Sequence, residues 1–261
     1  MFEVNNLTKV YPDGTVALRN VSFTVEPGEF LIIIGLSGSG KSTLLRCINR
    51  LIEPTEGKII WDGVDITAAE AVELRHIRRQ IGMIFQQFNL VKRSSVLTNV
   101  LTGRLGYVKP LNSLTHHFPA KDREMAWKAL ERVGITHQAH KQARELSGGQ
   151  QQRVGIARAL MQQPRMILAD EPVASLDPVL AHSILGYLEQ LNQEEKITVL
   201  CSLHYLDLVQ RYGTRVIGLR EGRVVYRGSQ EDIRRMSDEE FKEIYGEEAI
   251  RVSAGLKVEG A

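Results

Sequence analysis

The sequence predicts an α/β fold in which helices cover both faces of a mostly parallel β-sheet. Short apolar runs alternate with segments of helical periodicity along most of the 261 residues, and this order favours parallel strand pairing. One run, residues 30–34, is continuously apolar, as expected for a strand buried on both faces, and it continues into a glycine-rich loop. A second run, residues 166–169, ends in Asp170 and Glu171.

Composition narrows the class of protein. Hydrophobic residues make up 43% and charged residues 25% of the chain, which is long enough for one large domain or two small ones. The net charge of +2 gives no electrostatic reason to expect a nucleic-acid partner. The longest apolar run is too short to cross a bilayer, and residues 1–14 lack the features of a secretory signal. We therefore expect any membrane role to depend on a partner, and we expect Cys47 and Cys201 to be reduced core thiols.

The elements before residue 90 are predicted from composition and period. Runs rich in β-branched and aromatic residues predict strands at 2–4, 17–25, 30–34, 58–61 and 81–85. A helix is expected at 41–51 because Leu44, Leu45 and Ile48 recur at helical spacing.

The rest of the chain begins with a mostly helical segment, residues 95–163. Within it we expect a loop at 108–120, which contains two prolines and no hydrophobic period. Alternation then resumes with a strand at 166–169, a helix at 179–191 and a strand at 198–202. Two short strands at 216–219 and 224–226 close the fold, and the chain beyond residue 245 is a short polar tail.

Residues 35–42 match the phosphate-binding loop G-x-x-x-x-G-K-[ST], between a strand and a helix as the motif requires. Glycines let consecutive N–H groups point at phosphate oxygens, and the following helix N-terminus adds partial positive charge. Lys41 supplies a full charge for the β- and γ-phosphates, and Ser42 a hydroxyl for Mg²⁺. The nucleotide-binding residues expected here are Gly35, Leu36, Ser37, Gly38, Ser39, Gly40, Lys41, Ser42 and Thr43.

Asp170 and Glu171 are expected to have different roles, because adjacent strand residues point to opposite faces. Asp170 is placed to hold the Mg²⁺ shell, usually through water. Glu171 would point beyond the γ-phosphate, where it can act as a general base or position the attacking water. Alone, two acids could be a solvated strand end; their place downstream of a phosphate-binding loop favours the catalytic interpretation.

A polar turn at 146–153, Leu-Ser-Gly-Gly-Gln-Gln-Gln-Arg, leads into a predicted helix. With the phosphate-binding loop before it and the acidic strand end after it, the chain resembles the ATP-binding subunits of ABC transporters. The resemblance implies a nucleotide-binding domain over residues 1–246 with two lobes. One is a RecA-like P-loop NTPase core with an antiparallel β-subdomain, and the other is an α-helical subdomain at about 93–161. Residues 247–261 would form the polar tail.

The resemblance also implies roles for residues outside the phosphate-binding loop. Gln86 matches the glutamine that touches Mg²⁺ or the attacking water, with the adjacent Gln87 as the alternative. Tyr11 matches the aromatic that stacks on adenine, and His204 the histidine that contacts the γ-phosphate. Asp177 lies in Ala-Ser-Leu-Asp at 174–177, which resembles the D-loop although its small residues stand in a different order.

These assignments give three groups of expected site residues. The catalytic group is Glu171, His204 and Gln86, and the metal-binding group is Ser42, Gln86 and Asp170. In the family the signature turn at 146–150 completes the ATP site of the opposite subunit, so that a head-to-tail homodimer encloses two ATP molecules. The resemblance adds Ser147, Gly148, Gly149, Gln150 and Asp177 to the nucleotide-binding residues, with Ser147, Gly148 and Gly149 acting on the ATP of the opposite subunit.

Finer resemblance concerns the cargo. Residues 44–57, 77–106 and 167–178 resemble ATPase subunits of phosphonate importers. This implies an ATPase on the cytoplasmic face of the inner membrane that energises uptake of phosphonates, phosphite or related phosphorus oxyanions. Its partners would be integral membrane permease subunits and, indirectly, an extracytoplasmic solute-binding protein.

Two other functions stay open at this point. The chain could serve an importer for another small polar solute, such as amino acids. It could also be a soluble ABC ATPase outside transport, but such proteins usually carry two cassettes in one chain or a long coiled-coil insertion, and neither is present in this sequence.

Overall fold

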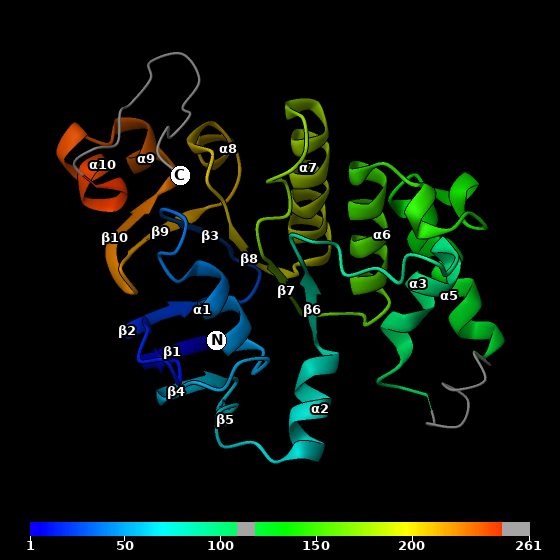
Figure 1. The fold of residues 1–261 in the computed structure, drawn as a ribbon, viewed down its shortest axis with the longest axis horizontal. Coiled ribbons are helices and arrows are strands. Elements are labelled where there is room, and N and C mark those ends of the chain that lie inside the picture. The colour runs from blue at the N-terminus through cyan, green and yellow to red at the C-terminus, as the bar shows by residue number, and fades with distance from the viewer. Residues whose placement is uncertain (109–117, 247–261) are drawn as a thin grey trace.

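The computed structural model describes residues 1–108 and 118–246, which form two β-sheets and the helices around them (Figure 1). The larger sheet has the strand order β10-β9-β3-β8-β7-β6. All neighbours pair in parallel except β10 and β9, so the predicted α/β fold with a mostly parallel sheet is confirmed. The strands are β3 (Phe30–Ile34), β6 (Ile81–Ile84), β7 (Met166–Ala169), β8 (Thr198–Ser202), β9 (Arg215–Arg220) and β10 (Arg223–Ser229).

The central strands are covered on both faces. Every residue of β3, β6, β7 and β8 is buried, and successive side chains point to opposite faces. Even-numbered residues of β3 pack into a core with α6 (Gly148–Leu160) and α7 (Pro178–Glu195). Odd-numbered residues of β3 pack into a second core with α1 (Lys41–Ile48) and the smaller sheet.

The smaller sheet is antiparallel, with the order β2-β1-β4-β5. Its strands are β1 (Phe2–Val10), β2 (Val16–Val25), β4 (Glu56–Trp61) and β5 (Val64–Asp65). The prediction that β1 ends at residue 4 was wrong. Pairing to β2 and β4 continues past polar residues such as Asn6, whose φ is 53°, with breaks in the register. Tertiary pairing here overrides a weak local preference for strand.

The chain segment that connects β6 to its neighbour β7 forms a group of helices, which lies to one side of these strands (Figure 1). Among the described residues it comprises α3 (Val96–Leu101), α5 (Ala120–Arg132), α6 and three short 3₁₀ segments at 102–104, 136–138 and 143–145. The mostly helical character predicted for 95–163 is confirmed for the residues described. Most of the predicted loop at 108–120 and the tail at 247–261 lie outside the described residues.

Several short elements were not predicted. These are α2 (Ala71–Arg79), α8 (Leu206–Arg211), α9 (Gln230–Arg235), α10 (Asp238–Tyr245) and β5. Both α9 and α10 begin with a capping box, in which a serine hydroxyl and the carboxylate three residues later satisfy each other's backbone N–H groups. That signal was present in the sequence, at Ser229 with Asp232 and at Ser237 with Glu240.

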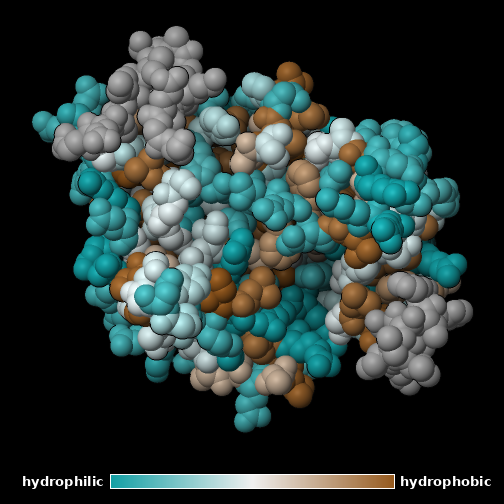
Figure 2. All heavy atoms as spheres, viewed as in Figure 1, coloured by the Kyte–Doolittle hydropathy of each residue, from teal (hydrophilic) through white to brown (hydrophobic). Residues whose placement is uncertain are grey.

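The described residues contain no helix that is both long enough and apolar enough to cross a membrane. On the face drawn in Figure 2, hydrophobic residues form separate small patches among hydrophilic ones.

Candidate active site

The candidate site lies at the carboxyl edge of the parallel sheet, where loops after neighbouring strands meet. The strands β3, β8 and β7 are adjacent, and Ile33 pairs with Ser202 and Ala169 with Cys201. The segments that follow these strands, residues 35–42, 170–171 and 203–204, therefore come together. They contain the predicted phosphate-binding loop, both acids and His204.

The phosphate-binding loop depends on glycine at two close backbone approaches. A Cβ at Gly35, whose φ is 144°, would lie 2.1 Å from the carbonyl oxygen of Leu219. A Cβ at Gly40, whose φ is 106°, would lie 2.5 Å from the carbonyl oxygen of Ala17. Only glycine fits both positions. The loop also contains the buried hydroxyl of Ser39, which has no hydrogen-bond partner in the described structure. An anionic ligand can supply the acceptor that this hydroxyl lacks.

Lys41 begins α1 and is only 3% exposed. Its Nζ donates to the carbonyl oxygens of Gly35 at 2.8 Å and Leu36 at 2.9 Å, and it lies 3.8 Å from Glu171 Oε1. Burial lowers the pKa of Lys41 to about 8, although the charges of Glu171 and Asp170 oppose that shift. The ammonium is thus a buried cation whose carboxylate neighbours do not fully offset its desolvation, which suits it to bind phosphate.

Asp170 is 1% exposed and is held from three sides. Its Oδ1 accepts a hydrogen bond from Ser42 Oγ at 2.7 Å and lies 3.4 Å from Ser202 Oγ, and its Oδ2 lies 3.3 Å from the guanidinium of Arg46. Neither Arg46 nor Ser202 was predicted as a site residue. Arg46 was accessible to sequence reasoning, because it lies one helical turn after Ser42.

The oxygen atoms of Asp170 and Ser42 are of the kind that binds magnesium. Hydroxyl and carboxylate oxygens are the ligands that Mg²⁺ prefers. Among the described residues, no cluster of three or more His, Cys, Asp or Glu side chains could hold a metal alone. Mg²⁺ usually takes one or two protein ligands and completes its shell with water and substrate phosphate, and Asp170 and Ser42 could supply those protein ligands.

Glu171 lies beside Lys41 and His204. Its Oε1 forms a short hydrogen bond with Nε2 of His204. Burial by itself raises the pKa of Glu171, but the hydrogen bond and charge of His204 and the charge of Lys41 outweigh it, so the pKa is lowered. The carboxylate is therefore ionised at neutral pH and able to accept a proton. Its φ of 47° is uncommon for a residue with a side chain.

Tyr11 lies near the same loop. It is half-buried, and its hydroxyl is 3.3 Å from Thr43 Oγ1 at the start of α1. Lys9 Nζ lies 5.3 Å from the ring centroid. The ring is thus placed beside the phosphate-binding loop, and its stacking on adenine stays a prediction.

Gln86 and Gln87 are both exposed in the turn that follows β6, so the structure does not separate the two candidates. The next two residues, Phe88 and Asn89, have φ values of 55° and 48°. Their carbonyl oxygens accept hydrogen bonds of 2.8 Å and 2.6 Å from the guanidinium of Arg158, on α6. These hydrogen bonds fix the turn after β6 to α6, the helix that follows the signature turn. The sequence did not predict this contact.

The signature turn caps α6. The Ser147 hydroxyl accepts from the amide of Gln150, and the Gln150 side chain accepts from the amide of Ser147. A Cβ on Gly149 would lie 2.6 Å from Leu180, and one on Gly148 would lie 3.7 Å from Phe88. The signature turn thus lies against α7 and against Phe88, in the segment that follows β6. In Figure 1, α6, which follows the signature turn, and α1, which follows the phosphate-binding loop, lie on opposite sides of β6 and β7. One chain therefore does not bring its signature turn to its own phosphate-binding loop.

Asp177 is exposed and serves as the N-cap of α7, accepting from the amide of Leu180 at 3.0 Å. Within one chain this capping contact explains its presence. Its predicted role in nucleotide binding stays a prediction.

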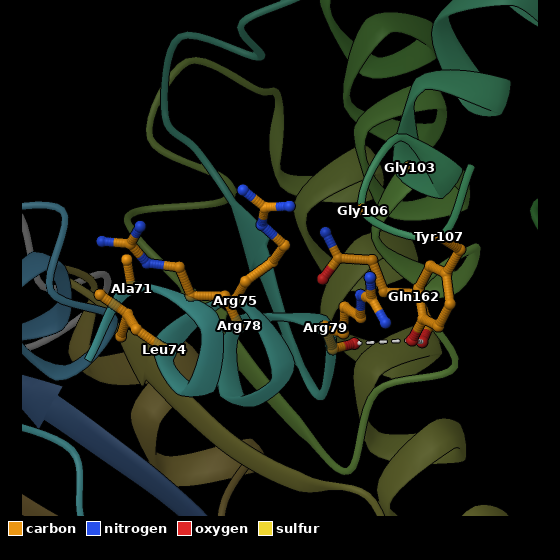
Figure 3. Close-up of a pocket in the computed structure, with 9 residues that line it drawn as sticks. All are labelled: Ala71, Leu74, Arg75, Arg78, Arg79, Gly103, Gly106, Tyr107 and Gln162. Atoms are coloured by element: carbon orange, nitrogen blue, oxygen red, sulfur yellow. Dashed lines mark hydrogen bonds between the residues drawn. The ribbon is translucent and has the colours of Figure 1, made fainter. Parts of the chain in front are cut away.

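A cavity of about 360 Å³ lies outside this site, between α2 and the segment at 103–107 (Figure 3). The hydroxyl of Tyr107 in its wall lies within hydrogen-bond distance of the carbonyl oxygens of Arg79 and Gln162. The Arg79 guanidinium lies 4.8 Å from the Tyr107 ring centroid. None of the residues that line this cavity was predicted as a site residue.

Comparison with known proteins gives consistent matches. A family model described as ABC transporter matches residues 18–174. The phosphonates import ATP-binding protein PhnC of Shouchella clausii is 54% identical over 246 residues, which cover 94% of this chain and 91% of that protein. The PhnC of Bdellovibrio bacteriovorus is 52% identical over 254 residues, which cover 97% of this chain and 96% of that protein.

Solved structures agree. The dimeric post-hydrolysis state of the ATP-binding cassette MJ0796, bound to ADP and Pi, is 37% identical with a TM-score of 0.79, and the match covers 88% of this chain and 99% of that one. The ADP conformation of the cassette MJ1267 is 34% identical with a TM-score of 0.80, and covers 93% of this chain and 97% of that one.

Proposed function

Because this chain belongs to the ABC transporter family, we propose that it is the ATP-hydrolysing subunit of a membrane importer for phosphonates. The observation that carries the proposal is the meeting of Lys41, at the start of the helix after β3, with Asp170 and Glu171, which directly follow β7. The cargo rests on the relatives, which are named for phosphonate import.

The residues divide the work of hydrolysis. Lys41 and the amides of the loop at 35–40 bind the β- and γ-phosphates, and Ser42 and Asp170 hold Mg²⁺. When bound, the metal supplies positive charge against the phosphate oxygens. Glu171 orients a water and accepts its proton as the water oxygen bonds to the γ-phosphorus. The bond from that phosphorus to the bridging oxygen breaks, which releases ADP and phosphate.

His204, two residues after the end of β8, supports this step. Its hydrogen bond to Glu171 fixes the carboxylate before a ligand arrives. Tyr11 stacks on the adenine, and Gln86 contacts the metal or the water. Preorganised contacts of this kind act on the transition state without further rearrangement.

A second copy of the chain completes the site. The helix α6, which the signature turn begins, and the helix α1, which follows the phosphate-binding loop, lie on opposite sides of β6 and β7 (Figure 1), so we expect a head-to-tail homodimer to bring the signature turn to the ATP of the other subunit. The solved MJ0796 cassette with ADP and Pi is a dimer. Closure of this dimer on ATP drives the permease, and the chain lies peripherally on the cytoplasmic side of the membrane.

The test is transport by the whole assembly. The chain is co-expressed with a phosphonate permease and solute-binding protein from its own organism, and the complex is reconstituted in vesicles. Methylphosphonate on the binding-protein side should stimulate ATP hydrolysis and accumulate inside, whereas polar amino acids should do neither. Stimulation by an amino acid alone would assign the importer to another cargo, and absence of ATPase activity from the intact complex would refute the enzymatic function.

A further inference from the structure

The hydroxyl of Ser202, at the carboxyl end of β8, contacts both acids of the candidate site. The residue is completely buried. Its Oγ accepts a hydrogen bond from the backbone amide of Glu171 at 2.9 Å and lies 3.4 Å from Asp170 Oδ1. We propose that Ser202 is a positioning residue for ATP hydrolysis, one that fixes Glu171 relative to Asp170. The inference rests on the proposed ATPase function.

The chemistry of the contact requires a hydroxyl. A serine hydroxyl has one hydrogen to donate and lone pairs to accept. It can therefore accept from the Glu171 amide and donate to the Asp170 carboxylate at the same time. An apolar side chain at position 202 would leave the Glu171 amide without this acceptor.

Glu171 needs such support because of its backbone. Its φ of 47° lies in the left-handed region, which a residue with a side chain occupies only where surrounding contacts hold it there. Ser202 holds the amide of Glu171, and His204 holds its carboxylate. Two residues from one strand end thus fix both ends of the proposed base.

The register of the sheet places Ser202 at this point. Cys201 pairs with Ala169 across β7 and β8, so Ser202 lies level with the first acid. Ile33 pairs with Ser202 from the other side, and the amide of Leu203 donates to the Ile33 carbonyl oxygen at 3.0 Å. The hydroxyl is therefore anchored in the central part of the sheet rather than in a loop.

The two acids do not depend on Ser202 equally. Asp170 keeps its 2.7 Å hydrogen bond from Ser42 when Ser202 is changed, whereas the Glu171 amide loses its hydroxyl acceptor. Removal of the hydroxyl should therefore slow hydrolysis more than it weakens binding of Mg-ATP. A loss of general stability alone would not separate kcat from KM in this way.

The experiment compares Ser202→Ala and Ser202→Cys, which remove the hydroxyl, with Ser202→Thr, which keeps it. Cys201→Ala is the matched control, because Cys201 is buried in the same strand and, as the neighbour of Ser202, points its side chain to the opposite face of the sheet. ATPase activity of each complete transporter complex is measured against ATP concentration, together with its Tm. If the alanine variant does not assemble, the cysteine variant carries the test.

We expect kcat to fall on the order of 10- to 100-fold in the alanine and cysteine variants, the size of effect that a small misplacement of a catalytic group produces. KM for ATP should stay within about twofold, and the threonine variant should retain most of the parental kcat. Parental kcat in the variants without a hydroxyl would overturn the proposal, as would an equal loss in Cys201→Ala or in Ser202→Thr. A parent complex with no ATPase activity would instead refute the proposed function.

Discussion

Replacing Glu171 with glutamine removes one negative charge from the candidate site and changes its size very little. In the structure Glu171 Oε1 lies 3.8 Å from Lys41 Nζ, and at an effective dielectric of about 20 this pair attracts by at most about 4 kcal/mol. The substitution releases Lys41 from that attraction. Binding of ATP is expected to be retained, because Ser42 and Asp170 are unchanged. It can also become stronger, because Lys41 no longer interacts with the Glu171 carboxylate.

Hydrolysis should respond in the opposite direction. A glutamine amide cannot accept the proton of the attacking water at neutral pH, and loss of a positioned base lowers rates on the order of 10²–10⁴-fold. That range corresponds to roughly 3–5 kcal/mol of activation free energy. Because binding favours the closed dimer and the step that reopens it is slow, a dimer should accumulate with Mg-ATP.

ATPase activity of the transporter complex and size-exclusion chromatography of the chain with Mg-ATP measure these two effects. Glu124→Gln is the control, because it removes the same charge from an exposed ion pair with Lys128 on α5. The reasoning fails if Glu171→Gln turns over ATP at nearly the parental rate, or if Glu124→Gln loses activity to the same extent.

Three further changes test other parts of the site. Ser147→Arg should leave ATP binding by the single chain within about twofold but abolish hydrolysis, since a bulky cation blocks the signature turn; titration showing lost binding would exclude action in the partner's site. Tyr11→Ala should weaken ATP binding by roughly 1–3 kcal/mol of stacking, and unchanged affinity would remove Tyr11 from the site. Lys41→Met should abolish tight ATP binding and remove the pH dependence of stability that the lysine contributes, because burial lowers the pKa of Lys41 from 10.5 to about 8. Between pH 8 and pH 10.5 the unfolded parent binds more protons than the folded parent, so the stability of the parent relative to the variant should rise with pH by up to about 3 kcal/mol; a constant difference in urea unfolding from pH 7 to 10.5 would contradict this.

The fold of the larger sheet was predictable because its strands carry strong local signals. Residues 30–34 and 166–169 are continuously apolar, and burial on both faces demands this. The end of α1 was not predictable from period alone. The helix stops at Ile48 rather than at residue 51, because Arg50 takes a φ of 47° and its guanidinium donates to the carbonyl oxygens of Ile66 and Ala69. Contacts with residues this distant in the sequence cannot be predicted from the neighbouring residues alone.

The candidate site divides in the same way. Motif spacing predicted that Lys41 and Glu171 belong to one site, since each follows a core strand. It did not predict Ser202, because only the register of β8 beside β7 brings that hydroxyl into contact with Asp170 and the amide of Glu171. A slip of one residue would turn its side chain to the opposite face of the sheet. Sequence patterns thus identified site residues that belong to a known motif. They did not identify Ser202, which reaches the site only through the pairing register of the strands.

The insertion of the helices between β6 and β7 has a consequence for biosynthesis. The phosphate-binding loop leaves the ribosome early, but its partners at 170–171 and 202–204 follow only after the whole helical segment has been made. At ordinary rates of translation the delay is roughly 10–30 s. During that interval β3 has neither of its parallel neighbours, β8 and β9, and its five apolar residues lack the cover of the finished sheet. The nascent chain therefore cannot assemble this nucleotide site until β8 has been made, and a chain truncated before residue 198 would expose an unpaired apolar strand suited to recognition by chaperones or proteases.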